Sequence, residues 1–378
     1  MTKITASWLT DPSAQRVCKV LTDAGYQAWF VGGCVRNALL DATVADLDLS
    51  TDAHPNVVTA LAQAAGLRVV PTGIDHGTVT ILAENTPFEI TTFRRDVATD
   101  GRRATVAFAD NMTDDALRRD FTVNALYADA QGNIADPLGG LPDLHARRIR
   151  FIEDANMRIK EDYLRILRFF RFYAWYGDVD AGPDADGLAA CADNIEGLQQ
   201  LSLERVTSEL LKLLAAPDPA AAVASMAATG ALGQILPGAN PAVLAVLVHV
   251  ELQAGMSPDP VRRLAVLGGD PVDVLRLSKD QAKRLDQIGA AMPHIEVAYR
   301  FGAAIGMDRI AIEAASIGHE IDPNIAQRAQ NAASQTFPVT AADFMPTLHG
   351  PALGRALKAA EARWIASDFT LTKVDLLG

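Results

Sequence analysis

WFVGGCVRNALLDATVADLDLST, residues Trp29 to Thr51, is the stretch that decides the predicted fold of this chain. Its opening apolar residues predict a short β-strand, and the Gly32-Gly33 pair ends that strand in a turn. The segment Val35 to Leu40 predicts a short helix, and the leucines that then alternate with aspartates predict a second, half-buried strand. The stretch therefore predicts a strand, a glycine turn, a helix and a strand in succession.

Two acidic side chains in this stretch indicate its chemistry. Asp46 and Asp48 are two positions apart, so on a strand both side chains point to the same face. Carboxylates this close repel each other unless a cation joins them, and such hard oxygen ligands suit Mg²⁺ bound together with phosphates. The glycines let the backbone approach a ligand closely, and the start of the helix offers N–H groups to an anion. Each feature alone is more often a plain turn or a solvated strand end, but together they predict metal-assisted phosphoryl or nucleotidyl transfer.

Four motifs in order carry a family resemblance. GGxVR followed by DxD is the signature of polymerase-β-like nucleotidyltransferases, and three motifs follow it: Arg118 to Leu126 (RRDFTVNAL), Glu161 to Phe172 (EDYLRILRFFRF) and Glu204 to Leu211 (ERVTSELL). In this order they resemble the class II CCA-adding tRNA nucleotidyltransferases and their close relatives, the bacterial poly(A) polymerases. The chain departs from the family pattern at Asn37, where Asp is usual, and at Asp41, where Gly is frequent.

The resemblance implies an α+β fold. A polymerase-β-like nucleotidyltransferase head, with helices around a mixed sheet of about five strands, is followed by an all-helical neck, body and tail. We place the catalytic head at residues 1–150 and the neck, expected to select the nucleotide and bind RNA, at residues 151–218. An all-helical body and tail, expected to bind tRNA, occupies residues 219–378.

Local patterns add expectations about individual elements. Arg94 to Met112 has little periodicity and predicts a loop, whereas Asp114 to Ala128 predicts a helix. Asp154 to Trp175 predicts one continuous helix. Residues 220–378 are rich in Ala and Leu and are broken by Gly and Pro, which predicts about seven short helices and no strands.

The resemblance also implies roles for residues of the head. Asp46 and Asp48 would hold two Mg²⁺ ions, Gly33 and Arg36 would hold the triphosphate, and Arg119 would face the nucleotide.

A third acid of the head is expected on a neighbouring strand. Phe88 to Phe93 (FEITTF) alternates like a strand and carries Glu89. An acid there would bind metal or take the proton from the attacking 3′-hydroxyl. A solvated strand carboxylate is the alternative interpretation of this residue.

A stripe of charged residues marks the neck. Asp162, Arg165, Arg168 and Arg171 recur every three residues, which places them along one side of the predicted helix. Three arginines at that spacing repel one another and need an anion, which a nucleoside triphosphate provides. The alternative is a surface helix on which Glu161 and Asp162 pair with the arginines.

By resemblance, Asp162 and Arg165 hydrogen-bond the Watson–Crick edge of the incoming base, and Arg168 and Arg171 continue toward the phosphates or the RNA end. A carboxylate accepts from an exocyclic amine, and an arginine donates to a ring nitrogen or a carbonyl. Cytosine and adenine carry an exocyclic amine where uracil and guanine carry a carbonyl. The pair would therefore admit CTP and ATP and refuse UTP and GTP.

Composition limits the partners. The chain has 378 residues, of which 49% are hydrophobic, and a net charge of −12, which argues against a broad, nonspecific grip on nucleic acid. Scattered Arg and Lys residues between Asp259 and Ile288 could grip a tRNA arm, with solvated helix faces as the alternative. Cys18, Cys34 and Cys191 form neither a zinc pattern nor a disulfide framework, which fits a reducing cytosol. With no signal segment and no membrane span in the sequence, we expect a soluble cytoplasmic protein.

We therefore expect a template-independent tRNA nucleotidyltransferase that adds C and A to the tRNA 3′ end from CTP and ATP with Mg²⁺. A poly(A) polymerase is the alternative. Thr72 to Thr80 (TGIDHGTVT), which looks like the CCA-adding branch, and the lack of a long basic tail favour the first hypothesis. A non-catalytic nucleotide-binding or RNA-binding protein is a third hypothesis, which the intact acid and arginine positions oppose.

Overall fold

The computed structural model describes residues 3–70, 73–74, 77–100, 103–345 and 347–378. The chain forms two compact units: Met1–Val206 with Ser225–Ile235, and Thr207–Ala224 with Leu236–Gly378. The division between the units falls within two helices, α9 (Leu203–Leu214) and α10 (Ala220–Ala228).

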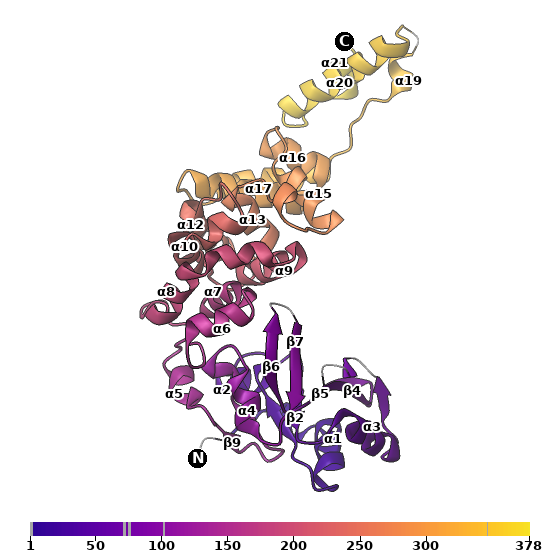
Figure 1. Ribbon diagram of the computed structural model, residues 1–378. Coiled ribbons are helices and arrows are strands. Elements are labelled where there is room, and N and C mark those ends of the chain that lie inside the picture. Colours follow the sequence, from indigo (N-terminus) through magenta and orange to yellow (C-terminus); the bar gives the residue numbers. More distant parts are fainter. Residues whose placement is uncertain (1–2, 71–72, 75–76, 101–102, 346) are drawn as a thin grey trace. The chain divides into compact units, whose positions relative to one another are not determined.

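A seven-stranded mixed sheet forms the centre of the first unit (Figure 1). Its strand order is β3-β4-β5-β2-β1-β8-β9, in which β2 and β5 are parallel and the other neighbours are antiparallel. The strands are β1 (Trp29–Val31), β2 (Asp48–Thr51), β3 (Arg68–Val70), β4 (Thr78–Ala83), β5 (Thr86–Thr92), β8 (Tyr127–Ala128) and β9 (Ile134–Ala135). The predicted α+β head with a mixed sheet is confirmed, with more strands than the five expected.

Some helices of the first unit pack around this sheet, and others follow it along the chain. They are η1 (Ser7–Thr10), α1 (Pro12–Thr22), α2 (Gly33–Leu39), α3 (Pro55–Ala64), α4 (Met112–Leu117), η3 (Thr122–Asn124), α5 (Gly140–His145), α6 (Ala155–Glu161), α7 (Leu164–Tyr176), α8 (Ala185–Asp193), η4 (Ile195–Gln200) and α11 (Ala231–Ile235). Helices α1 and α3 pack against each other and against β4 and β5 (Figure 1). Helix α1 begins at Pro12, where the Asp11 carboxylate accepts from the backbone N–H groups of Ser13 and Ala14 at 2.9 and 3.1 Å.

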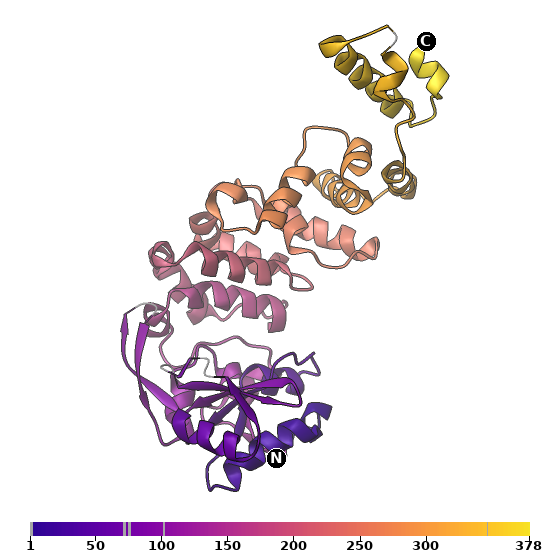
Figure 2. The ribbon, with the colours of Figure 1, turned by 90° about the vertical axis from the view of Figure 1, so that its right-hand side faces the viewer.

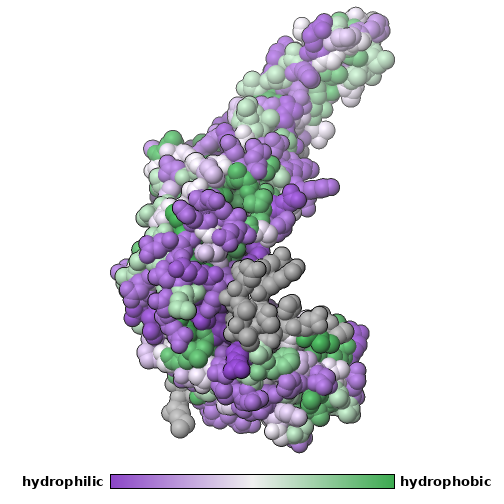
Figure 3. Space-filling view, viewed as in Figure 1, coloured by the Kyte–Doolittle hydropathy of each residue, from purple (hydrophilic) through white to green (hydrophobic). Residues whose placement is uncertain are grey.

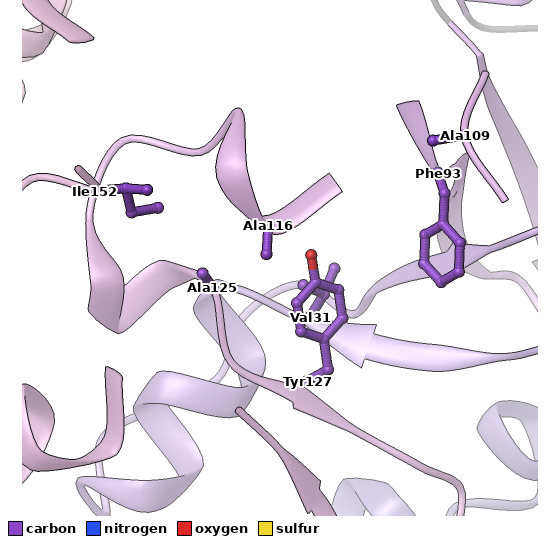
Figure 4. Packing of buried hydrophobic residues seen from close by; sticks show 7 residues of the cluster. All are labelled: Val31, Phe93, Ala109, Ala116, Ala125, Tyr127 and Ile152. Atoms are coloured by element: carbon purple, nitrogen blue, oxygen red, sulfur yellow. The ribbon is translucent and has the colours of Figure 1, made fainter. Parts of the chain in front are cut away.

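A hydrophobic cluster fixes α4 onto the sheet. Figure 4 shows Tyr127, from β8, with its hydroxyl directed toward the helix that carries Ala116. Val31 of β1 packs in the same cluster, and all three residues are buried. Because β1 leads into α2 and α4 leads into the RRD motif, this packing brings two of the predicted motifs together.

The segment Arg94 to Met112 is a β-ribbon and not the expected loop. β6 (Arg94–Asp100) pairs with β7 (Arg103–Phe108) in antiparallel register, from Arg94 opposite Phe108 to Asp100 opposite Arg103. Figures 1 and 2 show the two strands standing out from the main sheet as a separate pair. The sequences of both strands contain Val and Thr, which favour strand structure in spite of the polar composition of the segment.

The helix predicted over Asp114 to Ala128 is also wrong, because the chain leaves helical geometry after α4. Phe121 is extended (φ −121°, ψ 148°), forms a β-bridge to Phe151 and is buried. Tyr127 then pairs with Val31 in the sheet. Contacts with distant segments thus override a locally helical pattern.

The helix predicted over Asp154 to Trp175 is broken at one residue. α6 ends at Glu161 and α7 begins at Leu164, and Asp162 between them is extended (φ −155°, ψ 104°). The Asp162 carboxylate accepts from the backbone N–H of Leu164 at 3.1 Å. An acid that bonds the first turn of a helix favours a new helix start over continuation.

The described residues of the second unit form helices joined by loops, with no strand among them. The unit has more helices than the seven expected. They follow α9 and α10 as η5 (Pro241–Val243), α12 (Leu244–Gln253), α13 (Pro260–Leu267), α14 (Pro271–Val274), α15 (Lys279–Ile288), α16 (His294–Phe301), α17 (Ala303–Ser316), α18 (Pro323–Ala333), α19 (Ala341–Phe344), α20 (Gly350–Ala366) and α21 (Lys373–Leu377). Among the described residues, no helix is long and apolar enough to cross a membrane. On the face drawn in Figure 3, hydrophobic residues form separate patches among hydrophilic ones.

A buried ion network joins the helices of the second unit. Arg262 and Arg263 of α13 both pair with Glu251 of α12 at 2.7 Å, and Arg262 also pairs with Asp308 of α17 at 2.9 Å. These four side chains are at most 4% exposed. Arg284 of α15 pairs with Asp308 at 2.6 Å. Arg262 and Arg263 are therefore too buried to contact tRNA, and their guanidinium groups serve the fold, whereas a contact of the other basic residues between Asp259 and Ile288 with tRNA stays a prediction.

Removing the shared carboxylate should unfold this unit readily. We expect Glu251→Ala to lower the free energy of unfolding by about 3–5 kcal/mol, because it leaves two buried arginines without their common partner. Urea denaturation followed by circular dichroism measures this change. As a control, Arg328→Ala breaks a half-exposed pair with Asp368 and should cost less than about 1 kcal/mol. Equal stability of the two variants would contradict the structural role of the network.

Candidate active site

The glycine turn after β1 has a backbone that only glycine adopts easily. Gly32 has φ +71° and ψ −120° and precedes the first residue of α2, Gly33. A Cβ at Gly32 would lie 3.4 Å from Nη1 of Arg119. The turn is therefore required both for the backbone path and for the close approach of an arginine from the RRD motif.

Two carboxylates lie side by side at the start of β2. Asp48, the first residue of β2, is directly opposite Glu89 of β5 in the parallel register, so both side chains lie on the same face. Asp46 is exposed and precedes the strand, so the prediction of two acids on one strand holds only for Asp48. Burial, followed by the charge of Glu89, raises the pKa of Asp48 to about 6, while Arg119 opposes this and Asp46 adds to it. The structure thus brings together all three predicted acids.

This donor set fits a divalent cation. Carboxylate oxygens are the ligands that Mg²⁺ prefers, and the raised pKa of Asp48 shows negative charge gathered where a cation would relieve it. Within the described part of the chain, no group of three or more His, Cys, Asp and Glu side chains is arranged to hold a metal ion. Asp46, Asp48 and Glu89 could therefore supply part of a coordination shell that substrate phosphates would have to complete.

Arg119 is held beside these acids by residues that the sequence analysis missed. Its guanidinium donates to the Asp115 carboxylate at 3.0 Å, to the Tyr127 hydroxyl at 3.3 Å and to the Ser50 hydroxyl at 3.5 Å. Burial alone would raise the pKa of Asp115, but Arg119 and Arg118 lower it to about 2, so its negative charge is secure. Asp115, in the acidic first turn of α4, thus positions the motif arginine.

Arg36 is buried and occupied by protein partners. Its side chain is 6% exposed and donates to Asn37, Asn124 and Tyr176. In this structure its guanidinium is therefore not open to a triphosphate, contrary to the role expected from sequence.

The arginines of α7 have carboxylate partners within the protein. Arg165 pairs with Glu161 at 2.6 Å, and Arg168 donates to Asp120 at 2.7 Å. Arg171 lies over the ring of Phe172, 4.6 Å from its centroid. The argument that this stripe needs a bound anion is wrong, because Glu161 and the RRD aspartate already balance two of its charges.

Asp162 lies at the break between α6 and α7 and joins two motifs. One oxygen accepts from Leu164, and the other accepts from Nη2 of Arg205 at 2.6 Å. Arg205 belongs to the ERVTSELL motif, so this bond fixes the carboxylate predicted to read the base. The ion pair is about a quarter exposed on each side, so the acid stays within reach of a ligand.

Comparison with known proteins finds matches over the head and the neck. Residues 28–150 match the Poly A polymerase head domain, and residues 184–243 match the probable RNA and SrmB-binding site of polymerase A. Over 236 residues, the chain is 40% identical to a CCA-adding enzyme of Streptococcus pyogenes, covering 61% of this chain and 57% of that one. The chain is therefore similar to CCA-adding enzymes, and its two matched regions are similar to poly(A) polymerase domains.

A second curated relative and a solved structure extend the comparison. The human mitochondrial CCA tRNA nucleotidyltransferase 1 is 42% identical over 184 residues, 48% of this chain and 42% of its own. The chain thus spans about half the length of these curated relatives. A crystal structure of the Bacillus stearothermophilus CCA-adding enzyme in complex with CTP matches 95% of this chain and 94% of its own, with 25% identity and a TM-score of 0.72.

The two departures from the family pattern have local explanations. Asn37 accepts from Nε and Nη2 of Arg36 at 3.1 and 2.8 Å, so an amide oxygen meets the acceptor role of the usual aspartate. Asp41 has φ +54°, the left-handed region that favours glycine and that Asp tolerates better than most residues. Neither departure disturbs the acids of the site.

The repulsion at Asp48 predicts a gain of stability when its charge is removed. We expect Asp48→Asn to raise the free energy of unfolding by about 1–3 kcal/mol above pH 6, because the folded state raises this pKa from 3.8 to about 6. The gain should shrink as pH falls through this window, since the folded protein then holds the proton at lower cost. Thermal denaturation across pH measures the effect.

Asp46→Asn is the matched control for this prediction. Asp46 is exposed, so its substitution should leave stability nearly unchanged at every pH. If Asp48→Asn were no more stable than Asp46→Asn at neutral pH, the inferred repulsion between Asp48 and Glu89 would be wrong.

Proposed function

We propose that this protein is a template-independent tRNA nucleotidyltransferase that adds C and A to the tRNA 3′ end from CTP and ATP. The observation that carries the proposal is the pairing of Asp48 with Glu89 beside Arg119, in one unit with the Asp162 and Arg165 pair. Relatives named as CCA-adding enzymes, and a similar structure named as a complex with CTP, support the same activity.

The acids of the head would serve the transfer step. The tRNA 3′-oxygen attacks the α-phosphorus of the nucleotide, the bond from that phosphorus to the bridging oxygen breaks, and pyrophosphate leaves. Mg²⁺, held by Asp46 and Asp48, would lower the pKa of the hydroxyl and neutralise charge on the phosphates. Glu89 stands next to Asp48 as the third carboxylate, placed to complete the metal site or accept the proton of the hydroxyl. Gly33 and Arg119 would face the triphosphate.

Asp162 and Arg165 retain the capacity to read a base. A carboxylate has about four acceptor positions, and Asp162 uses two of them for Leu164 and Arg205. Arg165 donates once to Glu161 and to the carbonyl oxygens of Arg158 and Arg118, which engages three of its five N–H groups. The exocyclic amine of a base would donate to a free acceptor position of Asp162, and the adjacent ring nitrogen or carbonyl would accept from a free N–H of Arg165. Cytosine and adenine both carry such an amine beside such an acceptor.

The division of labour follows from the same proposal. Residues 1–150 would catalyse transfer, residues 151–218 would select the nucleotide with Arg168 and Arg171 toward the phosphates or the RNA end, and residues 219–378 would hold the tRNA.

A poly(A) polymerase is the second candidate, because the matching family models carry that name. The segment used to favour CCA addition, Thr72 to Thr80, includes positions 72, 75 and 76, which lie outside the described residues. We propose a cytoplasmic location, although the human relative is named as mitochondrial.

An extension assay tests the activity directly. Purified protein with Mg²⁺ is incubated with tRNA transcripts that end at the discriminator base, at C or at CC, together with CTP, ATP, both, or GTP and UTP. We expect growth to CCA and no further, with no incorporation of G or U, because the Asp162 and Arg165 pair admits only C and A. Replacing Mg²⁺ with a chelator, or Asp46 with Asn, should abolish extension.

An unstructured RNA in the same assay separates the candidates. Long A tails on this RNA would establish a poly(A) polymerase instead, and addition of A alone to CC-ended tRNA would restrict the activity to its last step. If no substrate is extended and Asp46→Asn behaves like the unchanged protein, the chain is not a nucleotidyltransferase.

A further inference from the structure

Arg36 makes an unusual set of bonds for a residue that follows a phosphate-type turn. Its Nε and Nη2 donate to Asn37, its Nη1 donates to Oδ1 of Asn124, and its Nη2 also donates to the Tyr176 hydroxyl at 2.9 Å. Four of its five N–H groups are therefore engaged by the protein. Each of these partners is neutral, so the guanidinium is held by shape and hydrogen bonding and not by a carboxylate.

Aromatic rings of α7 complete the surroundings of Arg36. The guanidinium carbon lies 4.1 Å from the centroid of the Tyr176 ring and 5.0 Å from that of Phe172. Such contacts suit the flat, weakly hydrated guanidinium group and not a lysine ammonium. Arg36 thus binds Tyr176 twice, once through its ring and once through its hydroxyl.

A second connection runs from the same point to the middle of α7. Nδ2 of Asn124 donates to Asp120 at 2.9 Å, and Asp120 accepts from Nε of Arg168 at 2.7 Å. Arg168 itself lies 5.2 Å from the centroid of the Phe172 ring, which also contacts Arg36. Helix α7 is therefore attached at Arg168 and at Tyr176, and both attachments meet at the pair Arg36 and Asn124.

We propose that Arg36 and Tyr176 are positioning residues for nucleotide selection. They fix α7, which carries Arg165, relative to the glycine turn at Gly32 and thereby set where the base-reading groups stand over the reacting phosphate. This inference rests on the proposed function of the site. Tyr176 lies outside every motif in the sequence, so only the structure assigns it a role.

The physical reason is that discrimination needs a fixed distance between two ends of one ligand. The phosphates are held at the head and the base is read at the start of α7, so a shift of α7 misaligns the base edge while the triphosphate stays bound. A misplacement of about 1 Å can cost roughly 10²-fold in a positioned reaction. A nucleotide that makes no good base contacts loses little from the same shift, so the loss appears as reduced selectivity.

The test uses Tyr176→Phe, Arg36→Lys and the double variant. Equilibrium binding of CTP, ATP, GTP and UTP with Mg²⁺ is measured for each, together with kcat/KM for extension of CC-ended and C-ended tRNA. We expect each single variant to reduce the preference for CTP over UTP by about five- to tenfold or more, since about fivefold to tenfold is the effect of losing one ordinary hydrogen bond. The double variant should be little worse than Arg36→Lys alone, because both changes remove the bond between Arg36 and Tyr176.

Tyr173→Phe is the matched control, since Tyr173 is a buried tyrosine on the same helix and makes no contact of this kind with Arg36. It should leave the preference unchanged. If Arg36→Lys weakens all four nucleotides equally and Tyr176→Phe has no effect, Arg36 is a triphosphate ligand and the positioning role is overturned. A lower melting temperature with unchanged preference would also overturn it.

The two proposals fail in different ways. Selective binding of CTP and ATP without any extension of tRNA would reject the proposed function, while the binding preference would still decide the role of Arg36 and Tyr176. If the unchanged protein binds all four nucleotides equally, both proposals are rejected.

Discussion

The burial of Asp48 beside Glu89 is the constraint on which the head depends. Parallel pairing of β2 with β5 places the two carboxylates side by side, and partial burial of Asp48 makes its charge more costly. Arg119 reduces this cost, and it stands in place because Asp115 and Tyr127 bind it from behind. Asp115 in the first turn of α4 and Tyr127 in the short strand β8 thus help the fold to accommodate an acid pair that lies two strands away from β8.

Ion pairing also explains how an acidic chain can resemble RNA-processing enzymes. In the neck, Arg165, Arg168 and Arg205 each have a carboxylate partner within the same unit. In the second unit, Arg262 and Arg263 are buried against Glu251. These arginines therefore add little positive surface, and any grip on nucleic acid must come from few, well-placed contacts. Such an arrangement favours recognition of one shape over attraction to any phosphate backbone.

The sequence predicted elements whose partners are close along the chain. The strand, turn, helix and strand of Trp29 to Thr51 are confirmed as β1, α2 and β2, because their apolar spacing and glycine turn are local signals. The break at Phe121 and the break at Asp162 were missed. Phe121 is extended because it pairs with Phe151, which lies outside any helix-length window. Asp162 accepts a local bond from the N–H of Leu164, a signal that the apolar periodicity concealed, and Arg205 adds a distant contact.

Site residues divide in the same way. The acids Asp46 and Asp48 were found from their spacing, and Glu161 was weighed as a partner of the arginines. Asp115 and Tyr176, in contrast, had no motif that marked them as partners of arginines. The case of Arg36 shows the limit of motif reading. A guanidinium behind a glycine turn suggests a phosphate ligand, but counting its N–H groups shows that asparagine and tyrosine already hold four of them.

The unfavourable charge at Asp48 also gives the site a reason to bind a cation. Energy stored as repulsion between carboxylates is released when a divalent ion joins them, so the same interaction that weakens the free protein strengthens metal binding. Protonation of Asp48 relieves the repulsion as well, and proton and cation therefore compete for the same oxygens. Because the pKa of Asp48 is about 6, the cation meets little competition at neutral pH and increasing competition below it. Deeper burial of Asp48 would raise its pKa further and bring this competition into the neutral range. Full exposure would remove the repulsion that a cation relieves. Partial burial at the start of β2 therefore keeps the carboxylate ionised at neutral pH and still suited to a cation.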